Sequence, residues 1–239
     1  MLAKRIIPTL LVRGRTLVKG ERFDSWRSIG HAAQAARVHA MRGVDELCIL
    51  DIAATKEGWG PDLKMVSELS EACFIPITVG GGVRRVEDID ALLRAGADKV
   101  CIGAAAGREF LLSASSRFGR QAIVVSLDVR YGDEPTRQRF LAQMAAMDFE
   151  DWGAGEILLQ CVERDGTMVG YDLDLIRAVS AAVNVPVIAS GGCGTYAHML
   201  EAFKAGADAC AAGAMFAFTD QTPRGAAAYL KSQSLEVRV

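Results

Sequence analysis

The sequence predicts a (β/α)₈ barrel, a closed ring of eight parallel strands surrounded by helices. Three observations predict this fold. Short apolar runs alternate with helix-period stretches from end to end, the chain has 239 residues, and an internal repeat divides it into two similar halves. A barrel of this class needs about 250 residues, so the length fits one closed barrel. We therefore expect a single domain over residues 1–239, built from two half-barrels of four βα units each.

The expected strands are apolar throughout rather than alternating, which is typical of parallel strands covered on both faces. They lie at residues 6–12, 46–51, 77–79, 99–102, 122–128, 156–161, 187–189 and 209–212. Helical periodicity between them predicts helices that include residues 32–42, 63–72, 86–94, 175–182 and 197–204. Strands that alternate with helices in this way favour a parallel sheet, and eight such units favour its closure.

Three segments recur with an offset of 110 residues, which supports the two half-barrels. Residues 95–98 recur as 205–208, residues 76–82 as 186–192, and residues 43–46 as 153–156. The second of these repeats carries a glycine pair directly after the third and the seventh strand. The two pairs should therefore lie on opposite sides of the barrel mouth, the end where the strands finish.

Composition excludes several classes of protein. Hydrophobic residues make up 51% of the chain, enough for a large core, so a disordered protein is excluded. The net charge of −2 and the lack of a basic block argue against a nucleic-acid partner. The first apolar run is too short to span a membrane, and no secretory signal is visible. The six cysteines form no C-x-x-C pair. We expect buried free thiols, no bound metal and a cytoplasmic location.

Glycines after strands predict a site for a phosphorylated small molecule. Gly191 and Gly192 end the seventh strand, and Gly213 and Ala214 follow the eighth. Glycines let backbone N–H groups turn toward an anion, and the start of a short helix adds a favourable dipole. The ends of strands seven and eight are the usual phosphate position in such barrels. The alternative is that these glycines only make tight turns.

The repeat implies a second phosphate site on the opposite side of the mouth. It would combine Gly81 and Gly82 with Gly103 and Ala104, although the last two supply no side-chain donor. A turn after the sixth strand adds Asp165 and Gly166 at the mouth. The alternative for Asp165 is that it only stabilises that turn.

Carboxylates at strand ends are the candidate acid–base groups. Asp51 ends the second strand and Asp128 ends the fifth, so both should point into the mouth. The alternative is a purely structural ion pair with a neighbouring cation such as Lys19 or Arg130.

Four charged residues should meet at the other end of the barrel, which we call the floor. Arg5 precedes the first strand, and Glu46, Lys99 and Glu156 start the second, fourth and sixth. Two cations and two anions there could form a ring, because charges inside a packed barrel are tolerated only when paired. From the residues alone, a structural plug is the simpler interpretation.

These motifs together resemble the cyclase subunit of imidazole glycerol phosphate synthase over nearly the whole chain. The matching stretches are MLAKRII, LVKG, DELCILDI, PITVGGG, AGADKV, GAGEILL, RDGT-x-x-GYD, IASGG and EAF-x-AGADA. The resemblance implies a lyase-type synthase that uses no cofactor. It also implies a glutaminase subunit that docks on the floor and sends ammonia through the barrel core to the mouth. The floor ring would then be the gate of that route. Lys19 would lie on a mobile first loop and act with Asp51 and Asp128.

Two departures from the family pattern bear on activity. The family uses a second acid–base aspartate at the end of the first strand, and Leu11 stands there. Leucine cannot move a proton, and losing half of such a pair typically removes orders of magnitude in rate. The family also has Asn-Thr where this chain has Gly103 and Ala104, which weakens the second phosphate site. The segment between Asp128 and Trp152 is short for the family and has no evident hairpin.

The stretch around Leu11 resembles cyclase paralogues found with acetamidino-sugar modification in surface polysaccharides. This resemblance implies that the barrel supplies ammonia to a nucleotide-linked sugar, whose amide an ATP-dependent amidotransferase would activate. Three hypotheses stay open at this point. The chain is a synthase subunit with such a substrate, a histidine-pathway cyclase that tolerates Leu11, or a non-catalytic conduit that passes ammonia to a separate enzyme.

Overall fold

Ten strands form one continuous sheet, eight of which close into a parallel barrel. The computed structural model describes residues 3–103 and 107–238, so Ala104 lies outside it. The barrel strands are β1 (Arg5–Arg13), β4 (Leu47–Asp51), β5 (Ile77–Gly80), β6 (Lys99–Ile102), β7 (Ile123–Val129), β8 (Glu156–Cys161), β9 (Val187–Ser190) and β10 (Ala209–Ala212). β10 pairs in parallel with β1, and this pairing closes the barrel.

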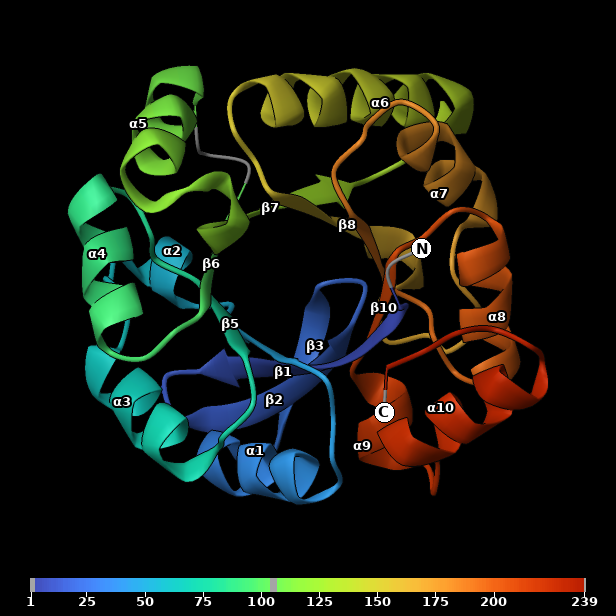
Figure 1. Cartoon of the computed structure of the whole chain (residues 1–239), viewed down its shortest axis with the longest axis horizontal. Coiled ribbons are helices and arrows are strands. Elements are labelled where there is room, and N and C mark those ends of the chain that lie inside the picture. The colour runs from blue at the N-terminus through green and yellow to red at the C-terminus, as the bar shows by residue number, and fades with distance from the viewer. Residues whose placement is uncertain (1–2, 104–106, 239) are drawn as a thin grey trace.

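Helices surround the strands on all sides (Figure 1). They are α1 (Ala32–Met41), α2 (Ala54–Glu57), α3 (Leu63–Ala72), α4 (Val86–Arg94), α5 (Arg108–Phe118), α6 (Pro135–Asp151), α7 (Leu173–Ser180), α8 (Tyr196–Lys204), α9 (Ala214–Phe218) and α10 (Pro223–Ser232). Short 3₁₀ turns occupy Arg120–Ala122 and Val162–Arg164. Residues near the two ends of the described chain lie side by side, since Lys4 forms a parallel bridge with Val237. The expected (β/α)₈ barrel is confirmed.

The sequence repeat reappears as repeated hydrogen bonds. Asp98 Oδ2 accepts the backbone N–H of Ile77 at 2.8 Å, and Asp208 Oδ2 accepts that of Val187 at 3.1 Å. The first bond joins the residue before β6 to the start of β5, and the second joins the residue before β10 to the start of β9. Each half-barrel also caps its second long helix with an aspartate, Asp62 on α3 and Asp172 on α7. The two half-barrels, related by an offset of 110 residues, are therefore similar in structure as well as in sequence.

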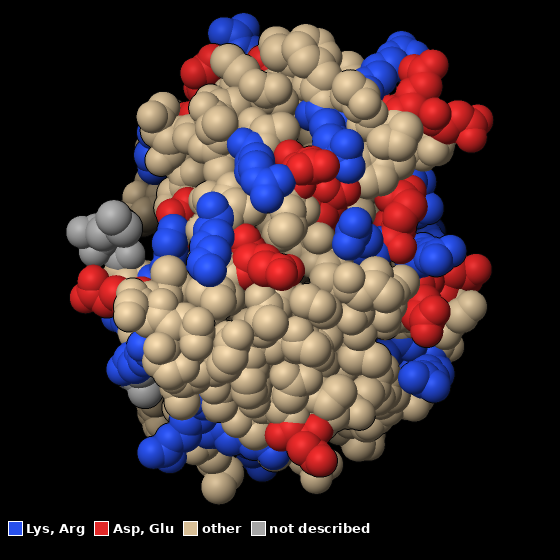
Figure 2. Space-filling view, turned by 90° about the vertical axis from the view of Figure 1, so that its right-hand side faces the viewer, with Lys and Arg blue, Asp and Glu red and all other residues tan. Residues whose placement is uncertain are grey.

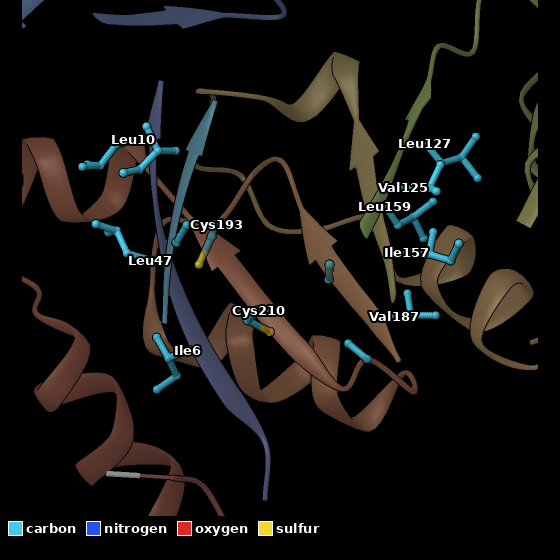
Figure 3. Close-up of a cluster of buried hydrophobic side chains, with 14 of the residues drawn as sticks. Ile6, Leu10, Leu47, Val125, Leu127, Ile157, Leu159, Val187, Cys193 and Cys210 are labelled. Atoms are coloured by element: carbon cyan, nitrogen blue, oxygen red, sulfur yellow. The ribbon is translucent and has the colours of Figure 1, made fainter. Parts of the chain in front are cut away.

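Two apolar cores lie on the two faces of the barrel wall. The smaller one fills the inside of the barrel with Ile7, Cys48, Cys101, Val124, Leu158, Ile188, Ala209 and Ala211. The larger one lies between the strands and the helices. Figure 3 shows part of it, where the side chains of Val125, Leu127, Ile157 and Leu159 gather beside β7 and β8. Truncating one such fully buried side chain to alanine typically costs about 2–5 kcal/mol of folding free energy.

All eight barrel strands lie where they were predicted, and the errors are shifts of one or two residues at the ends of strands and helices. Strands β6, β8 and β10 have the predicted bounds, as do helices α3 and α4. The fifth strand begins at Ile123 rather than one residue earlier, because a 3₁₀ turn ends at Ala122. Helix α7 begins two residues before the predicted start, because the side chain of Asp172 accepts the N–H of Leu175 and caps it there.

A β-hairpin follows β1 and was missed at the sequence level. It consists of β2 (Thr16–Glu21) and β3 (Asp24–His31), and β2 pairs antiparallel with the end of β1. Its tip is a tight turn with Arg22 and Phe23 at positive φ, positions that usually take Asn or Gly. The hairpin forms the connection between β1 and α1, where Lys19 was expected, and Lys19 lies within its first strand, β2. The mobility of this segment stays a prediction.

The described residues contain no helix that is both long enough and apolar enough to cross a membrane. All six cysteines are buried, as expected. Figure 2 shows the face formed by the side of the molecule on the right of Figure 1. Lys and Arg mix with Asp and Glu in its upper part, and charged residues are sparse in its lower part. No area of a single charge sign dominates this face.

Candidate active site

A pocket of about 690 Å³ opens at the C-terminal ends of the barrel strands. We call it the mouth pocket. The sequence-predicted mouth residues that line it are Lys19, Asp51, Gly81, Gly82, Gly103, Asp128, Asp165, Gly166, Gly191, Gly192, Gly213 and Ala214. The fold thus brings all of these residues to one cavity, from both half-barrels. Their roles in phosphate binding and catalysis stay predictions from the sequence.

Asp128 faces the pocket from β7, where water can reach it. Its Oδ1 accepts a hydrogen bond from the Ser126 hydroxyl at 2.9 Å. Protein surrounds the carboxylate on its other sides, and this partial burial raises the pKa of Asp128. The Ser126 hydrogen bond and the charge of Arg130 oppose the rise in pKa. A carboxyl group with a raised pKa is better suited to proton transfer near neutral pH.

Leu11 lines the same pocket from β1 and is 8% exposed. It pairs with Leu50 of β4, whose side chain also lines the pocket. This part of the mouth is therefore an apolar wall. Leu11 is the counterpart of Asp128 in the first half-barrel, because their partners Leu50 and Gln160 are 110 residues apart. That the family uses an aspartate at this position stays a prediction.

Asp165 supplies a second carboxylate to the mouth. Its Oδ2 is buried and has no hydrogen-bond partner. Burial raises the pKa of Asp165, the charge of Lys19 and the amide of Gln160 lower it, and the nearby Asp128 raises it again. Gln160 of β8 lines the pocket and is 7% exposed. The interpretation of Asp165 as only a turn-stabilising residue does not account for its buried and unpartnered oxygen.

Lys19 is 6% exposed, although its side chain carries an ammonium group. Its Nζ donates to the carbonyl oxygen of Thr9 at 3.4 Å. It also lies against the backbone of Gly213, where a Cβ would collide with it. Burial lowers the pKa of Lys19 to about 8, against the opposing effect of Asp165. The hairpin therefore holds a cation directly over the predicted phosphate site at β10.

Asp51 has a local structural role that the sequence did not indicate. Its Oδ1 accepts the backbone N–H groups of Ala53 and Ala54 at 2.9 and 3.1 Å. These bonds turn the chain after β4 and start α2. The alternative of an ion pair with Lys19 was wrong, because Lys19 lies near Asp165 instead.

The mouth glycines also have a packing reason to be glycine. Gly191 has φ +88°, and a Cβ there would lie 2.5 Å from the carbonyl oxygen of Cys161. In the other half-barrel, a Cβ on Gly81 would collide with the carbonyl oxygen of Asp51. Asp51 and Cys161 are themselves 110 residues apart, so the two close approaches are equivalent. Tight packing and anion binding are compatible, because both bring backbone to the pocket surface.

The two phosphate-site candidates differ in what surrounds them. At β9 and β10, helix α9 begins directly after Gly213, and the Lys19 ammonium lies beside that glycine. At β5 and β6, a cation comes instead from Arg84, which lines the pocket and donates to the carbonyl of Thr55 at 3.2 Å. Sequence reasoning missed Arg84, although it closely follows the glycine pair. Phe23 and Trp26 of the hairpin were missed because the hairpin itself was not predicted.

The four floor residues meet in a closed ring of ion pairs. Arg5 Nη1 lies 2.8 Å from Glu46 Oε2 and 3.1 Å from Glu156 Oε1. Lys99 Nζ lies 3.0 Å from each of the same two carboxylates. Burial by itself would raise the pKa of Glu46, but the charges of Lys99 and Arg5 outweigh it and keep that pKa low. The hydroxyl of Thr78 also donates to Glu46, at 2.7 Å.

The inner apolar core lies between this ring and the mouth pocket. Cys101 belongs to that core and also lines the pocket, so the two regions are continuous. Among the described residues, no group of three His, Cys, Asp or Glu side chains is placed to hold a metal ion. The carboxylates of the mouth pocket can transfer protons, and Lys19 and Arg84 can attract an anion.

The chain matches the family described as "Histidine biosynthesis protein" over residues 5–222. The match covers nearly the whole barrel, from β1 to the residue before α10. The chain therefore belongs to this family. The membership agrees with the observed fold and with a histidine-biosynthesis-type barrel enzyme.

Proposed function

We propose that this member of the histidine biosynthesis protein family is the synthase subunit of a glutamine amidotransferase complex. A separate glutaminase would dock on the floor and release ammonia there. The ammonia would pass through the barrel to the mouth pocket and react with a phosphorylated substrate. We further propose that this substrate is a nucleotide-linked sugar whose acetamido group becomes an amidine.

The observation that carries the proposal is the contrast between an intact floor and an altered mouth. The floor has all four charges of the predicted gate, with every charge paired. The mouth has Leu11 where the cyclase pattern requires an aspartate. A chain under no demand for ammonia transfer has little reason to keep four charges in a barrel, because well-packed apolar residues are often as stable. The change at Leu11 favours a different acceptor.

The barrel interior suits the passage of a neutral molecule. Above the ring, the inner core consists of apolar and thiol side chains, several of them as small as Ala209, Ala211 and Cys101. Ammonium would lose its hydration there at a large cost in free energy, whereas neutral ammonia would not. We infer that any proton is removed at the floor, where glutamate and lysine are in contact, and that ammonia travels uncharged.

The amidination can be written so that its atoms balance. An ATP-dependent amidotransferase would first transfer a phosphoryl group from ATP to the oxygen of the acetamido group and release ADP. The nitrogen of ammonia then attacks the carbon, a C–N bond forms, and the bond from carbon to that oxygen breaks, so that phosphate leaves. Asp128 would accept the proton that the attacking nitrogen loses. Asp165 and Lys19 would orient the phosphorylated part of the substrate.

Family membership favours a second candidate, a cyclase of histidine biosynthesis that works with Leu11. Asp128 would then have to carry the acid–base chemistry without a partner in β1. A third possibility is that the barrel only conducts ammonia to another enzyme. The altered mouth weighs against the second, and a pocket with two carboxylates of raised pKa weighs against the third.

The deciding experiment measures ammonia-dependent turnover of the histidine-pathway intermediate, phosphoribulosyl formimino carboxamide ribotide. Purified barrel is assayed at high ammonium and alkaline pH, so that free ammonia replaces the glutaminase. We expect no turnover. Clear turnover would instead assign the chain to histidine biosynthesis and overturn the sugar substrate.

A second assay uses the complex with its glutaminase and activating enzyme. Replacing Lys99 by alanine should uncouple glutamine hydrolysis from product formation, because the gate loses a cation. Unchanged coupling would contradict the ammonia route. Replacing Asp128 by asparagine should abolish product formation if the barrel does chemistry, and intact product formation would identify a conduit.

A further inference from the structure

Helix α6 has apolar side chains on both of its faces. Its inner face packs against the barrel with Ala142, Ala146 and Phe149, which are buried. The helix lies outside β7 at the edge of the molecule, and no element of the described chain lies beyond it (Figure 1). A surface helix usually presents polar residues on the side away from the core. The outer face of α6 therefore differs from that of an ordinary barrel helix.

Four large apolar side chains lie exposed on this outer face, and we call them the α6 stripe. They are Phe140, Leu141, Met144 and Met147, with exposed fractions of 59%, 46%, 43% and 41%. Their spacing of three and four residues places them on one side of the helix. Phe and Met are more frequent in protein–protein interfaces than on the remaining surface of proteins. The α6 stripe is therefore suited to contact another protein chain.

The charges at the two ends of the α6 stripe have opposite signs. Arg137 lies in the first turn of α6, whereas Asp148 and Asp151 lie in its last turn, and all three are exposed. Arg137 pairs with Glu134 at 3.1 Å but keeps 70% of its side chain exposed. Within residues 3–103 and 107–238, neither of the two aspartates forms a salt bridge. A cation at the start of a helix and anions at its end oppose the helix dipole, so this order of charges does not stabilise α6 itself.

A second copy of the chain, related by a two-fold axis, would match both the apolar and the charged parts of this face. Met144 lies seven residues after Arg137 and seven residues before Asp151. If two α6 helices lie antiparallel with Met144 at the axis, Arg137 of each copy meets Asp151 of the other. Leu141 meets Met147 in the same arrangement. A two-fold interface requires a surface that is complementary to itself, and the order of residues along α6 satisfies this requirement.

We propose that two copies of this chain associate through α6 as an antiparallel helix pair, with Met144 at the two-fold axis and two Arg137–Asp151 ion pairs. The 17 residues of α6 span about 25 Å, so the whole α6 stripe and both charged ends can be in contact. One helix face is a small interface, so we expect a Kd on the order of 10 μM. The inference is independent of the proposed function, because the described lining of the mouth pocket includes no residue of α6.

Sedimentation velocity of the full chain, from about 1 to 500 μM, tests the association. We expect a reversible dimer whose Kd rises at least about tenfold in Met144→Glu, because two carboxylates would then meet at the axis. Met41→Glu is the matched control, since Met41 is 88% exposed at the end of α1, on the opposite side of the barrel from α6 (Figure 1). It should leave the Kd unchanged. A native chain that stays monomeric at the highest concentration would overturn the proposal and leave the α6 stripe to a different protein.

Charge reversal tests the antiparallel register. Arg137→Asp and Asp151→Arg each replace two attractive pairs by two repulsive ones in every dimer, so each variant alone should raise the Kd about tenfold. An equimolar mixture of the two variants should dimerise about as well as the native chain, because each copy then meets a residue of opposite charge. A mixture that associates no better than the separate variants would contradict this register, and a dimer that Met144→Glu leaves intact would place the interface on another face.

Discussion

The two ends of the barrel interior hold charges in opposite ways. On the floor, two cations and two anions pair at 2.8–3.1 Å, so each charge is compensated within the protein. At the mouth, Lys19, Asp128 and Asp165 gather in one pocket, but within residues 3–103 and 107–238 no salt bridge joins any of them to an opposite charge.

The two arrangements suit the two ends to different tasks. Compensated charges are stable without a ligand, which suits a closed gate or plug. Uncompensated buried charges cost folding free energy, and a ligand of the right charge can recover part of that cost on binding. The floor is therefore complete by itself, whereas the mouth has charges that a bound ligand could compensate. The same contrast predicts opposite effects of removing a charge at the two ends.

The greatest loss of stability is expected on the floor. Glu46→Ala would leave both Arg5 and Lys99 with one anion fewer in a buried setting. Removing one partner of a buried pair typically costs about 3–5 kcal/mol, because the remaining charge is uncompensated. We expect a loss of that size in the free energy of unfolding, measured by urea denaturation.

Glu57→Ala is the control for this floor variant. Glu57 pairs with Arg13 at the same 2.8 Å separation as Glu46 with Arg5, but on the surface, with 62% of the Arg13 side chain exposed. Its loss should cost less than about 1 kcal/mol, as exposed pairs usually do. Similar losses for the two variants would mean that the ring is not held as a buried network.

Removing a charge at the mouth should have the opposite sign. Lys19→Met keeps most of the side chain's length and removes an ammonium group whose pKa is lowered by burial from 10.5 to about 8. We expect the free energy of unfolding to rise by about 1–3 kcal/mol, because the lowered pKa measures the cost of burying the charge and the substitution removes that cost. The packing contacts that the substitution loses reduce the gain. The same variant should lose most of its affinity for phosphate. A destabilised Lys19→Met protein would show that Asp165 compensates this lysine after all.

The lowered pKa of Lys19 also fixes a pH dependence. Its folded pKa of about 8 lies below its unfolded value of 10.5, so the cost of the buried charge is fully present below pH 8. That cost is relieved as pH rises from about 8 to 10.5, and this residue's contribution to stability increases over that window. Phosphate binding needs the charge, so its affinity should fall up to about tenfold per pH unit above pH 8.

Sulfate is the control ligand for this titration, because it does not change its own charge in the range. The affinity of the native chain for sulfate should also fall above pH 8, whereas the affinity of Lys19→Met for either anion should not change with pH. If the affinity of the native chain for sulfate does not change with pH, Lys19 does not contribute its charge to the phosphate site.

The sequence predicted which charged residues lie at the floor and which lie at the mouth, because the pattern of short apolar runs locates the strands. Buried parallel strands are short apolar runs, so Arg5 and Lys99 could be placed at strand starts and Asp128 at a strand end. Residues at strand starts must meet on the floor, whatever the loops do. The repeat of 110 residues further fixed the opposite positions of Gly81 and Gly191.

What escaped prediction depends on loops and on tertiary contacts. The hairpin has a polar second strand and a turn with Arg22 and Phe23 at positive φ, so it carries neither a long apolar run nor an Asn-Gly signal. The position of Lys19 over Gly213 follows from that hairpin and could not be derived without it. Similarly, only the structure reveals that Asp51, besides lining the mouth pocket, accepts the backbone N–H groups that turn the chain after β4.

The most modest change is expected from restoring the missing carboxylate at the mouth. Leu11→Asp puts an acid opposite Asp128, on a wall now formed by Leu11 and Leu50. The new charge adds to the three carboxylates of the mouth pocket, and Lys19 is the nearby cation that can offset it. We therefore expect the free energy of unfolding to fall by about 1–3 kcal/mol. Ammonia-dependent turnover of the histidine-pathway intermediate should become just detectable above that of the native chain. Leu11→Asn has the same shape without the charge and should give no gain. If Leu11→Asp also gives none while the protein stays folded and binds phosphate, the mouth has diverged from the cyclase pattern in more than one residue.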